Sequence, residues 1–133
     1  MAPRLDIVTP ELKNDPPRLR GTVAGFGDRR AQLLLVQDDG YVVNLNNVKG
    51  ALTPSDDNTM KFSVRIGKAK PGPPQPQLLI AVVSSMPLVA LNFAQDGAPA
   101  EQVFRQALTE AAERSLPLNV SAKFIVLEKV LEK

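Results

Sequence analysis

The sequence predicts a mainly β protein of the α+β class, an antiparallel β-sandwich of about seven strands with one amphipathic helix in the C-terminal half. Apolar and polar residues alternate with a period of two in several short segments, turn residues separate those segments, and a period of 3.6 appears once, near residues 99–115. The 133 residues match one domain. We place it at residues 18–133, behind a proline-rich lead-in at residues 1–17.

The lead-in and the segment after it both favour extended backbone. Prolines at positions 3, 10, 16 and 17 disfavour a helix, and the alternation of Leu5 and Ile7 predicts an edge strand. From residue 18 the sides alternate again, with Leu19 and Val23 on the apolar side. We therefore predict a half-buried strand there.

The next two runs predict a hairpin. Residues 31–37 are almost continuously apolar, which indicates a strand buried on both faces, and residues 41–45 form the second strand. Asp38, Asp39 and Gly40 separate the runs. Because glycine accepts the positive φ of a type I′ turn, we expect that turn at the hairpin tip.

Residues 60–68 show the clearest alternation in the chain. The two sets of side chains are Phe62, Val64 and Ile66 on one side and Lys61, Ser63 and Arg65 on the other. This pattern predicts a sheet with one face in water. Residues 68–77 contain four prolines and a glycine, which predicts an exposed loop and argues against a central strand. We expect residues 77–85 to form a core strand and residues 86–93 to continue in an extended conformation.

One helix and one further strand complete the prediction. The helix has Pro99 in its first turn, and its apolar face consists of Val103, Phe104, Ala107, Leu108, Ala111 and Ala112. Its outer face carries Glu101 with Arg105 and Glu110 with Arg114, both at the i, i+4 spacing. In the last strand, Val120, Ala122, Phe124 and Val126 alternate with Ser121, Lys123 and Ile125.

Composition argues against several classes of function. The chain has no cysteine and no histidine, so it lacks the commonest general base and the commonest metal ligand. We therefore expect no enzyme activity and no cofactor. The net charge is only +2, which disfavours nucleic acid as a partner. Residues 78–91 are too short and too interrupted to cross a membrane, and residues 1–20 lack the apolar core of a signal peptide.

Two acidic turns are candidates for a metal site. Calcium requires about six to eight oxygen ligands, and neither turn has the spacing of an EF-hand loop. Asp38 and Asp39 can complete a calcium cage with Asp56 and Asp57 only if the two turns meet. Aspartate is common in plain turns, so we favour a structural role and expect no metal.

Basic side chains are the candidate binding residues. They are Arg18, Arg20, Arg29, Arg30, Lys68 and Lys70. If they share one surface, they can bind a phosphate or an acidic partner. The chain has one tyrosine and no tryptophan, so base stacking is poorly supplied. Solvated strand faces remain the simpler explanation of these residues.

Two further motifs allow a functional interpretation. Ser84 and Ser85 follow a strand, and one of them is a candidate nucleophile with Lys68 or Lys70 as its base. No G-x-S-x-G motif surrounds the two serines. Pro71 to Pro74 forms a P-x-x-P of the kind that an SH3-like groove binds. An ordinary hydroxyl and a stiff surface loop are the favoured interpretations.

The order of elements in residues 19–91 resembles a bacterial domain family of unknown function. The features that carry the resemblance are the hairpin with Asp39-Gly40 at its tip, the Pro71-Gly72 loop, and the strand that ends at Ser85 before Pro87. Members are small β-sandwiches found C-terminal to caspase-like peptidases, protein kinases and lipoproteins. The resemblance implies an accessory module and supplies no catalytic residues.

From these observations we expect a non-catalytic binding or regulatory domain of a larger bacterial envelope or signalling protein, monomeric in isolation, that contacts protein or glycan. A periplasmic or cell-envelope location fits this expectation better than the cytoplasm. The alternative is a stand-alone interaction module, such as an inhibitor or an assembly subunit, that captures its partner with an exposed strand edge.

Overall fold

The computed structural model describes residues 2–56 and 58–131. Within them lie eight strands, two α-helices and two 3-10 helices, which we label in chain order. The strands are β1 (Arg4–Ile7), β2 (Arg18–Ala24), β3 (Arg30–Val36), β4 (Val42–Asn44), β5 (Leu52–Asp56), β6 (Thr59–Arg65), β7 (Gln75–Ser84) and β8 (Asn119–Leu127). The helices are η1 (Thr9–Lys13), η2 (Leu45–Asn47), α1 (Val89–Asn92) and α2 (Ala100–Glu113).

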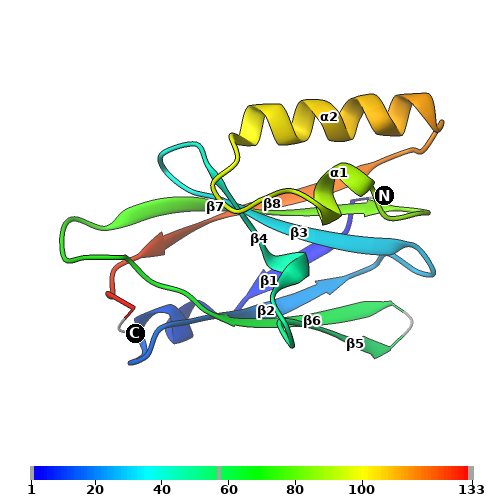
Figure 1. Cartoon of the computed structure of the whole chain (residues 1–133). Helices are drawn as coiled ribbons and strands as arrows, with labels where there is room; N and C mark the ends of the chain where they lie inside the picture. The colour runs from blue at the N-terminus through cyan, green and yellow to red at the C-terminus, as the bar shows by residue number, and fades with distance from the viewer. Residues whose placement is uncertain (1, 57, 132–133) are drawn as a thin grey trace.

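The strands form two four-stranded antiparallel sheets. Sheet A has the order β1-β2-β6-β5, and sheet B has the order β4-β3-β7-β8. The sheets are stacked, and α1 and α2 lie on the outer face of sheet B (Figure 1). The predicted fold class, a mainly β sandwich with one main helix, is confirmed.

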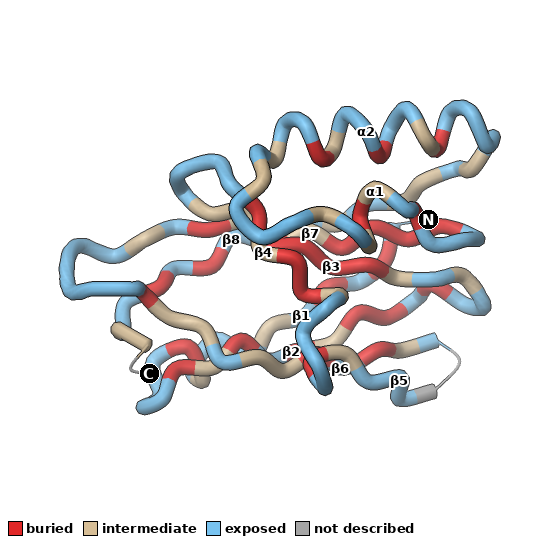
Figure 2. Tube along the Cα trace, in the orientation of Figure 1, coloured by how far each residue is buried: buried red, intermediate tan, exposed pale blue. Residues whose placement is uncertain are grey.

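Two separate cores follow from this three-layer arrangement. The first core fills the space between the sheets and includes the fully buried Leu19, Leu33, Phe62 and Leu79. The second core lies between sheet B and the helices, and its buried residues are Leu34, Val42, Val82, Leu88, Leu91, Val103, Ala107 and Ala111. Figure 2 shows the buried positions on sheet B and on the underside of α2. The two central strands of sheet B, β3 and β7, are therefore covered on both faces, as the apolar run of β3 predicts.

The edge strand predicted in the lead-in is β1, and it belongs to the sandwich. Leu5 pairs in register with Val23 of β2, and it is 3% exposed. Leu12 of η1 is also buried in the first core. Residues 2–17 thus contribute one strand to sheet A and the buried side chains of Leu5 and Leu12 to the first core, with Ile7 packed against it.

Residues 86–93 do not continue in the extended conformation that we predicted. Residues Val89–Asn92 form α1 instead. The Glu110 carboxylate of α2 accepts hydrogen bonds from the backbone N–H groups of Val89 (2.7 Å) and Ala90 (2.9 Å), which satisfies the first turn. Leu88 and Leu91 are buried against sheet B. A side chain about twenty residues away thus decides the local conformation.

The predicted loop at residues 68–77 ends earlier than expected, because β7 begins at Gln75. Pro76 pairs in register with Val126 of β8, whereas pairing of β7 with β3 begins only at Leu78. Pro76 therefore lies where β7 has a neighbour on one side only, and its missing N–H costs no bond to β3.

The hairpin between β3 and β4 is confirmed, but its turn is not type I′. The Gly40 N–H donates to the Gln37 carbonyl (2.9 Å), so Asp38 and Asp39 occupy the central positions. Neither aspartate has a positive φ, whereas Gly40 has φ of 88°. This is the three-residue loop in which a left-handed glycine follows an ordinary turn. The second strand is also shorter than predicted, because η2 follows Asn44.

The helix prediction is confirmed over most of its length. Val103, Ala107 and Ala111 of α2 are buried. Leu108, which we placed on the same apolar face, is 63% exposed because it lies at the rim of the contact with sheet B. Among the described residues, no helix has the length and apolar character needed to cross a membrane.

Candidate functional site

Strand β8 presents the longest open sheet edge in the described part of the molecule. It has nine residues and pairs with β7 at every position from Asn119 to Leu127. On its other side no described residue makes a backbone hydrogen bond with it. On that side the Ser121 hydroxyl donates a hydrogen bond to the Pro3 carbonyl. An open edge of this length can accept a further strand.

The other three sheet edges are closed or shortened. The free side of β4 is covered, because the Val42 N–H donates to the Ala98 carbonyl (2.9 Å) and the Gly97 N–H donates to the Val42 carbonyl (2.9 Å). Strand β5 contains Pro54 and a register shift after it. Strand β1 has only four residues. These devices are typical of protected edges, and β8 has neither a proline nor a bulge.

The outer face of β8 is apolar and exposed. Val120 is 49% exposed, Phe124 is 78% exposed and Val126 is 46% exposed. On the opposite face, Ile125 and Leu127 are buried in the first core. A small apolar notch of about 140 Å³ under α2, lined in part by Ile80, Leu108 and Val120, continues the outer surface. Contiguous exposed apolar surface of this kind marks interaction sites.

A groove runs along the inner side of the same edge. It has a volume of about 350 Å³ and is lined by residues of β1, η1 and β8, among them Ile7, Leu12, Lys13 and Lys123. Lys123 is the register partner of Leu79, a core residue, so its side chain points to the inner side of β8. Lys13 has a weak ion pair with Glu128 at 3.9 Å. Among the described residues Lys123 has no ion pair.

Lys123 restricts what can pair with β8. An inward-pointing charge on an edge strand opposes pairing with an identical strand, because two such lysines come close together. A segment that places a carboxylate opposite Lys123 is favoured, because opposite charges on facing residues attract each other. The edge is therefore suited to a partner that is extended, apolar at alternate positions and acidic near its centre.

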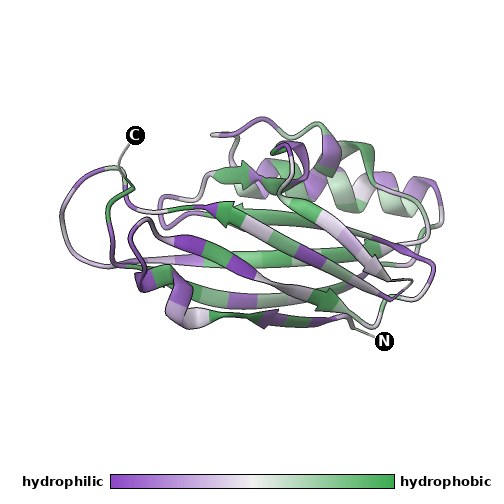
Figure 3. Ribbon diagram, turned by 90° about the horizontal axis from the view of Figure 1, so that it is seen from below, coloured by the Kyte–Doolittle hydropathy of each residue, from purple (hydrophilic) through white to green (hydrophobic). Residues whose placement is uncertain are grey.

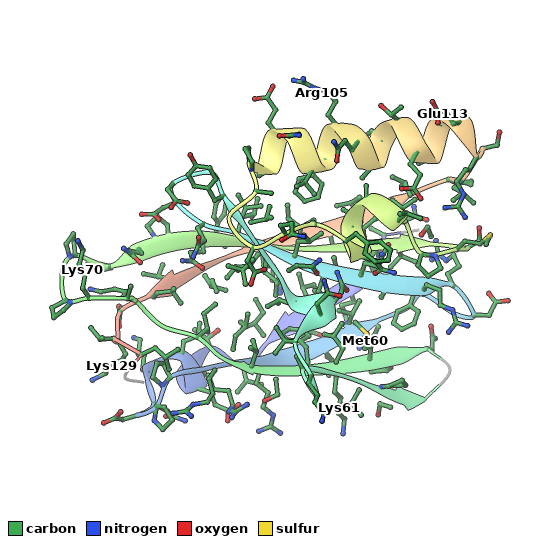
Figure 4. All side chains as sticks on the ribbon, viewed as in Figure 1. Met60, Lys61, Lys70, Arg105, Glu113 and Lys129 are labelled. Carbon is green, nitrogen blue, oxygen red and sulfur yellow. The ribbon has the colours of Figure 1, made fainter. Side chains whose placement is uncertain are left out.

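The basic candidate residues lie in three different parts of the molecule. Arg18 and Arg20 belong to β2 and lie on the outer face of sheet A, together with Lys61 and Arg65 of β6. Figure 3 views the molecule from this side and shows hydrophilic and hydrophobic bands that alternate along the strands. In Figure 4, Lys61 points away from the interior, whereas the neighbouring Met60 points between the sheets.

Arg29 and Arg30 lie at the opposite end of the sandwich from Arg18. They line an open hollow of about 480 Å³ beside Phe26 and Met60. The Arg29 guanidinium donates to the Phe26 carbonyl (3.1 Å) and to the Asn119 side chain, so it holds the loop before β3 in place. Arg29 therefore has a structural role.

Lys68 and Lys70 lie in the proline loop and differ in exposure. Lys68 is 3% exposed, and its ammonium donates to the carbonyls of Gly72 and Pro73. These two hydrogen bonds hold the proline loop in place. Lys70 is exposed at the loop surface (Figure 4). The structure therefore does not bring Lys68 to the surface that Arg18 and Arg20 share.

The two acidic turns lie at opposite ends of the sandwich. Asp38 and Asp39 follow the end of β3, and the Asp39 side chain accepts a hydrogen bond from the Tyr41 N–H (3.1 Å). Asp56 lies at the β5–β6 hairpin, near the start of β3 (Figure 1). Asp57 and the side chain of Asp56 lie outside the described residues. Among the residues described, no three carboxylates gather in a metal-binding group.

The two serines are remote from the lysines that we considered as bases. Ser84 is fully buried at the end of β7, and its hydroxyl donates to the Met86 carbonyl (2.6 Å). Lys68 and Lys70 lie beyond the other end of this ten-residue strand. The structure does not form a serine–lysine pair from these residues.

Sequence reasoning missed the residues that make β8 distinctive. The alternation of Phe124 and Val126 with Ile125 and Leu127 is apolar on both sides, so it does not tell which face is buried. Lys123, the one charge in the strand, was the available signal.

Comparison of the chain with protein-family models, with curated proteins and with solved structures finds no match in any of the three.

Proposed function

We propose that this chain is a non-catalytic binding domain that takes an extended segment of a protein partner onto the free edge of β8. The observation that carries the proposal is the combination of an open nine-residue edge, an exposed apolar face and Lys123, which has no ion pair among the described residues. Backbone hydrogen bonds from the added strand supply affinity, and alternate side-chain contacts supply specificity.

The two faces of β8 suggest how such a segment is recognised. Its outward side chains contact the apolar surface around Phe124 and Val126, and its inward side chains enter the groove beside Ile7 and Leu12. A carboxylate at the central inward position pairs with Lys123. Capture by an exposed strand edge, the alternative expected from the sequence, is thus the proposed mechanism of binding.

The resemblance to accessory β-sandwiches supports a wider setting for the same function. In that setting the domain belongs to a larger bacterial envelope or signalling protein, and the captured segment regulates or recruits that protein. The domain remains monomeric on its own because Lys123 opposes pairing of two β8 edges.

The chain offers a matched pair of variants for testing the proposal. Phe124 on β8 and Phe93 after α1 are the same residue type at nearly equal exposure, 78% and 75%. We expect immobilised wild-type domain and the Phe93→Lys variant to retain the same protein from a lysate of the source cell. Phe124→Lys and Lys123→Glu are expected to lose it.

The reverse pattern identifies a different interface. If Phe93→Lys abolishes capture while Phe124→Lys retains it, the partner binds the α1 side and the proposal is wrong. Capture that survives both Phe124→Lys and Lys123→Glu also contradicts the proposal, because each of these two variants removes a contact that the added strand requires.

A further inference from the structure

A second binding site is indicated on the outer face of sheet A, on the opposite layer of the molecule from the helices. Arg18 of β2 and Arg65 of β6 are direct cross-strand partners. The residues that follow Arg18 and precede Arg65, Leu19 and Val64, are also register partners and turn toward the core. Both arginines therefore point outward from the same place on the sheet.

This arrangement is unfavourable for the fold alone. The Cβ atoms of directly opposed residues are about 4.5–5.5 Å apart, and like charges at that separation destabilise a sheet. Strands β2 and β6 are the two central strands of sheet A, so protection of an edge does not explain the pair. Among the described residues neither Arg18 nor Arg65 has an ion pair.

A hydroxyl completes the arrangement. The Arg18 guanidinium donates to the Ser63 side-chain oxygen at 2.7 Å, which orients the guanidinium across the strands toward β6. The Ser63 hydroxyl proton remains available for donation to a ligand oxygen. By contrast, Arg20 on the same face is already paired with Glu11 at 3.3 Å.

We propose that Arg18, Arg65 and Ser63 form a binding site for a phosphoryl group. One guanidinium is sufficient for a carboxylate, which has a single negative charge and two oxygens in a plane. Two guanidiniums and a hydroxyl match a phosphate, which has a charge of about −1.5 to −2 at pH 7 and three acceptor oxygens. Arg18 is half-buried and Arg65 is exposed on the outer face of sheet A, which favours a phosphoryl group presented by a protein over an enclosed metabolite.

The site is tested by NMR titration of the whole chain. The probes are inorganic phosphate, a short peptide with phosphoserine, the same peptide with serine, and acetate. We expect saturable shifts at Ser63 and at the side-chain N–H groups of Arg18 and Arg65 with the two phosphate probes only. Tighter binding of the phosphopeptide assigns the ligand to a protein source, and equal binding assigns it to free phosphate.

Variants and pH separate this site from general attraction to a basic protein. Arg65→Gln is expected to weaken phosphate binding about tenfold or more, and Arg105→Gln on α2 is expected to leave it unchanged. Binding is expected to weaken below about pH 6, where phosphate loses its second charge. Arg65→Thr is also expected to raise Tm by about 1–4 °C, because it removes the like-charge pair.

The proposal is overturned if no probe produces saturable shifts, if acetate matches phosphate, or if Arg105→Gln weakens binding as much as Arg65→Gln. These outcomes are independent of the strand-edge proposal, because Arg18 and Arg65 lie on sheet A and β8 belongs to sheet B.

Discussion

Asn44 ties sheet B to the segment between α1 and α2. Its side chain is buried, and its amide Nδ2 donates to the carbonyls of Leu91 (2.8 Å), Asn92 (3.2 Å) and Ala94 (2.9 Å). Its Oδ1 accepts from the backbone N–H of Asn46 at 3.0 Å. One polar side chain thus supplies hydrogen-bond donors to three carbonyls around the end of α1.

We predict that Asn44→Ala lowers the free energy of unfolding by about 2–4 kcal/mol, because it removes three hydrogen bonds to backbone carbonyls, among them the buried bond to Leu91. Asn47→Ala is the control. Asn47 is exposed and its Nδ2 donates to the Asn92 carbonyl (2.8 Å), so loss of this side chain is expected to cost less than about 1 kcal/mol. Urea denaturation measures both, and equal effects contradict the role of Asn44.

Glu110 caps α1 from a neighbouring helix. Burial acts to raise the pKa of Glu110, but hydrogen bonds from the Ala90 and Val89 amides and the Arg114 guanidinium outweigh it, so the pKa lies below its usual value of about 4.5. A carboxylate whose pKa is lowered by folding stabilises the folded state above its unfolded pKa, and this contribution disappears as the pH falls through the folded pKa.

We therefore predict that Glu110→Gln destabilises the protein by about 1 kcal/mol at pH 7. The difference from the wild type is expected to shrink as the pH falls from about 5 toward 3. Glu101→Gln is the matched control, because Glu101 is paired with Arg105 at the same i, i+4 spacing but is 81% exposed. Its effect is expected to be close to zero at all pH values, as measured by urea denaturation across this range.

At the scale of elements, β8 shows most clearly where sequence patterns stop being informative. The strand itself follows from its alternation, but its orientation follows from register with β7, which places Ile125 opposite Gln77 and on the core side. Both sets of alternate positions are apolar, so only the tertiary structure selects the buried set.

This orientation predicts that substitutions at two adjacent residues differ strongly in their effect on stability. Ile125→Ala is expected to destabilise the protein by about 2–4 kcal/mol because it opens a cavity in the first core. Phe124→Ala, although it removes the larger side chain, is expected to change stability by less than about 0.5 kcal/mol, since Phe124 is 78% exposed. Chemical denaturation compares the two variants, and a larger effect of Phe124→Ala reverses the assignment of faces.

The elements that the sequence predicted well are those whose pattern is local. Leu19 and Val23 in β2, and Val103 and Ala107 in α2, repeat with the period of their own element. Helix α1 was missed because its first turn depends on Glu110. Strand β5 was missed because Pro54 and turn-forming residues hide a short edge strand that exists only through pairing with β6.

The candidate sites were less predictable than the fold for the same reason. Arg18 and Arg20 were recognised as basic, but the partner of Arg18 is Arg65, about fifty residues away in the chain, and only the register brings them together. Likewise, the open edge of β8 is a property of strand order, which alternation does not encode.

At the scale of the whole molecule, the three layers separate two surfaces of different chemistry. The outer face of sheet A is basic and rich in hydroxyls, whereas the β8 side of sheet B combines an open edge with exposed apolar side chains. Strand β8 pairs with β7 at every position and buries Ile125 and Leu127 in the first core, which makes it a rigid template. A rigid edge favours capture because little order has to be imposed on the domain when it binds.

Hydrogen–deuterium exchange of the domain, alone and with its captured partner, tests strand addition at β8 most directly. In the free domain we expect the amides of Asn119–Leu127 that do not bond to β7 to exchange rapidly, and in the complex we expect them to become protected while the α1 region stays unchanged. Unchanged exchange across β8, with new protection around α1 or β4, contradicts the account.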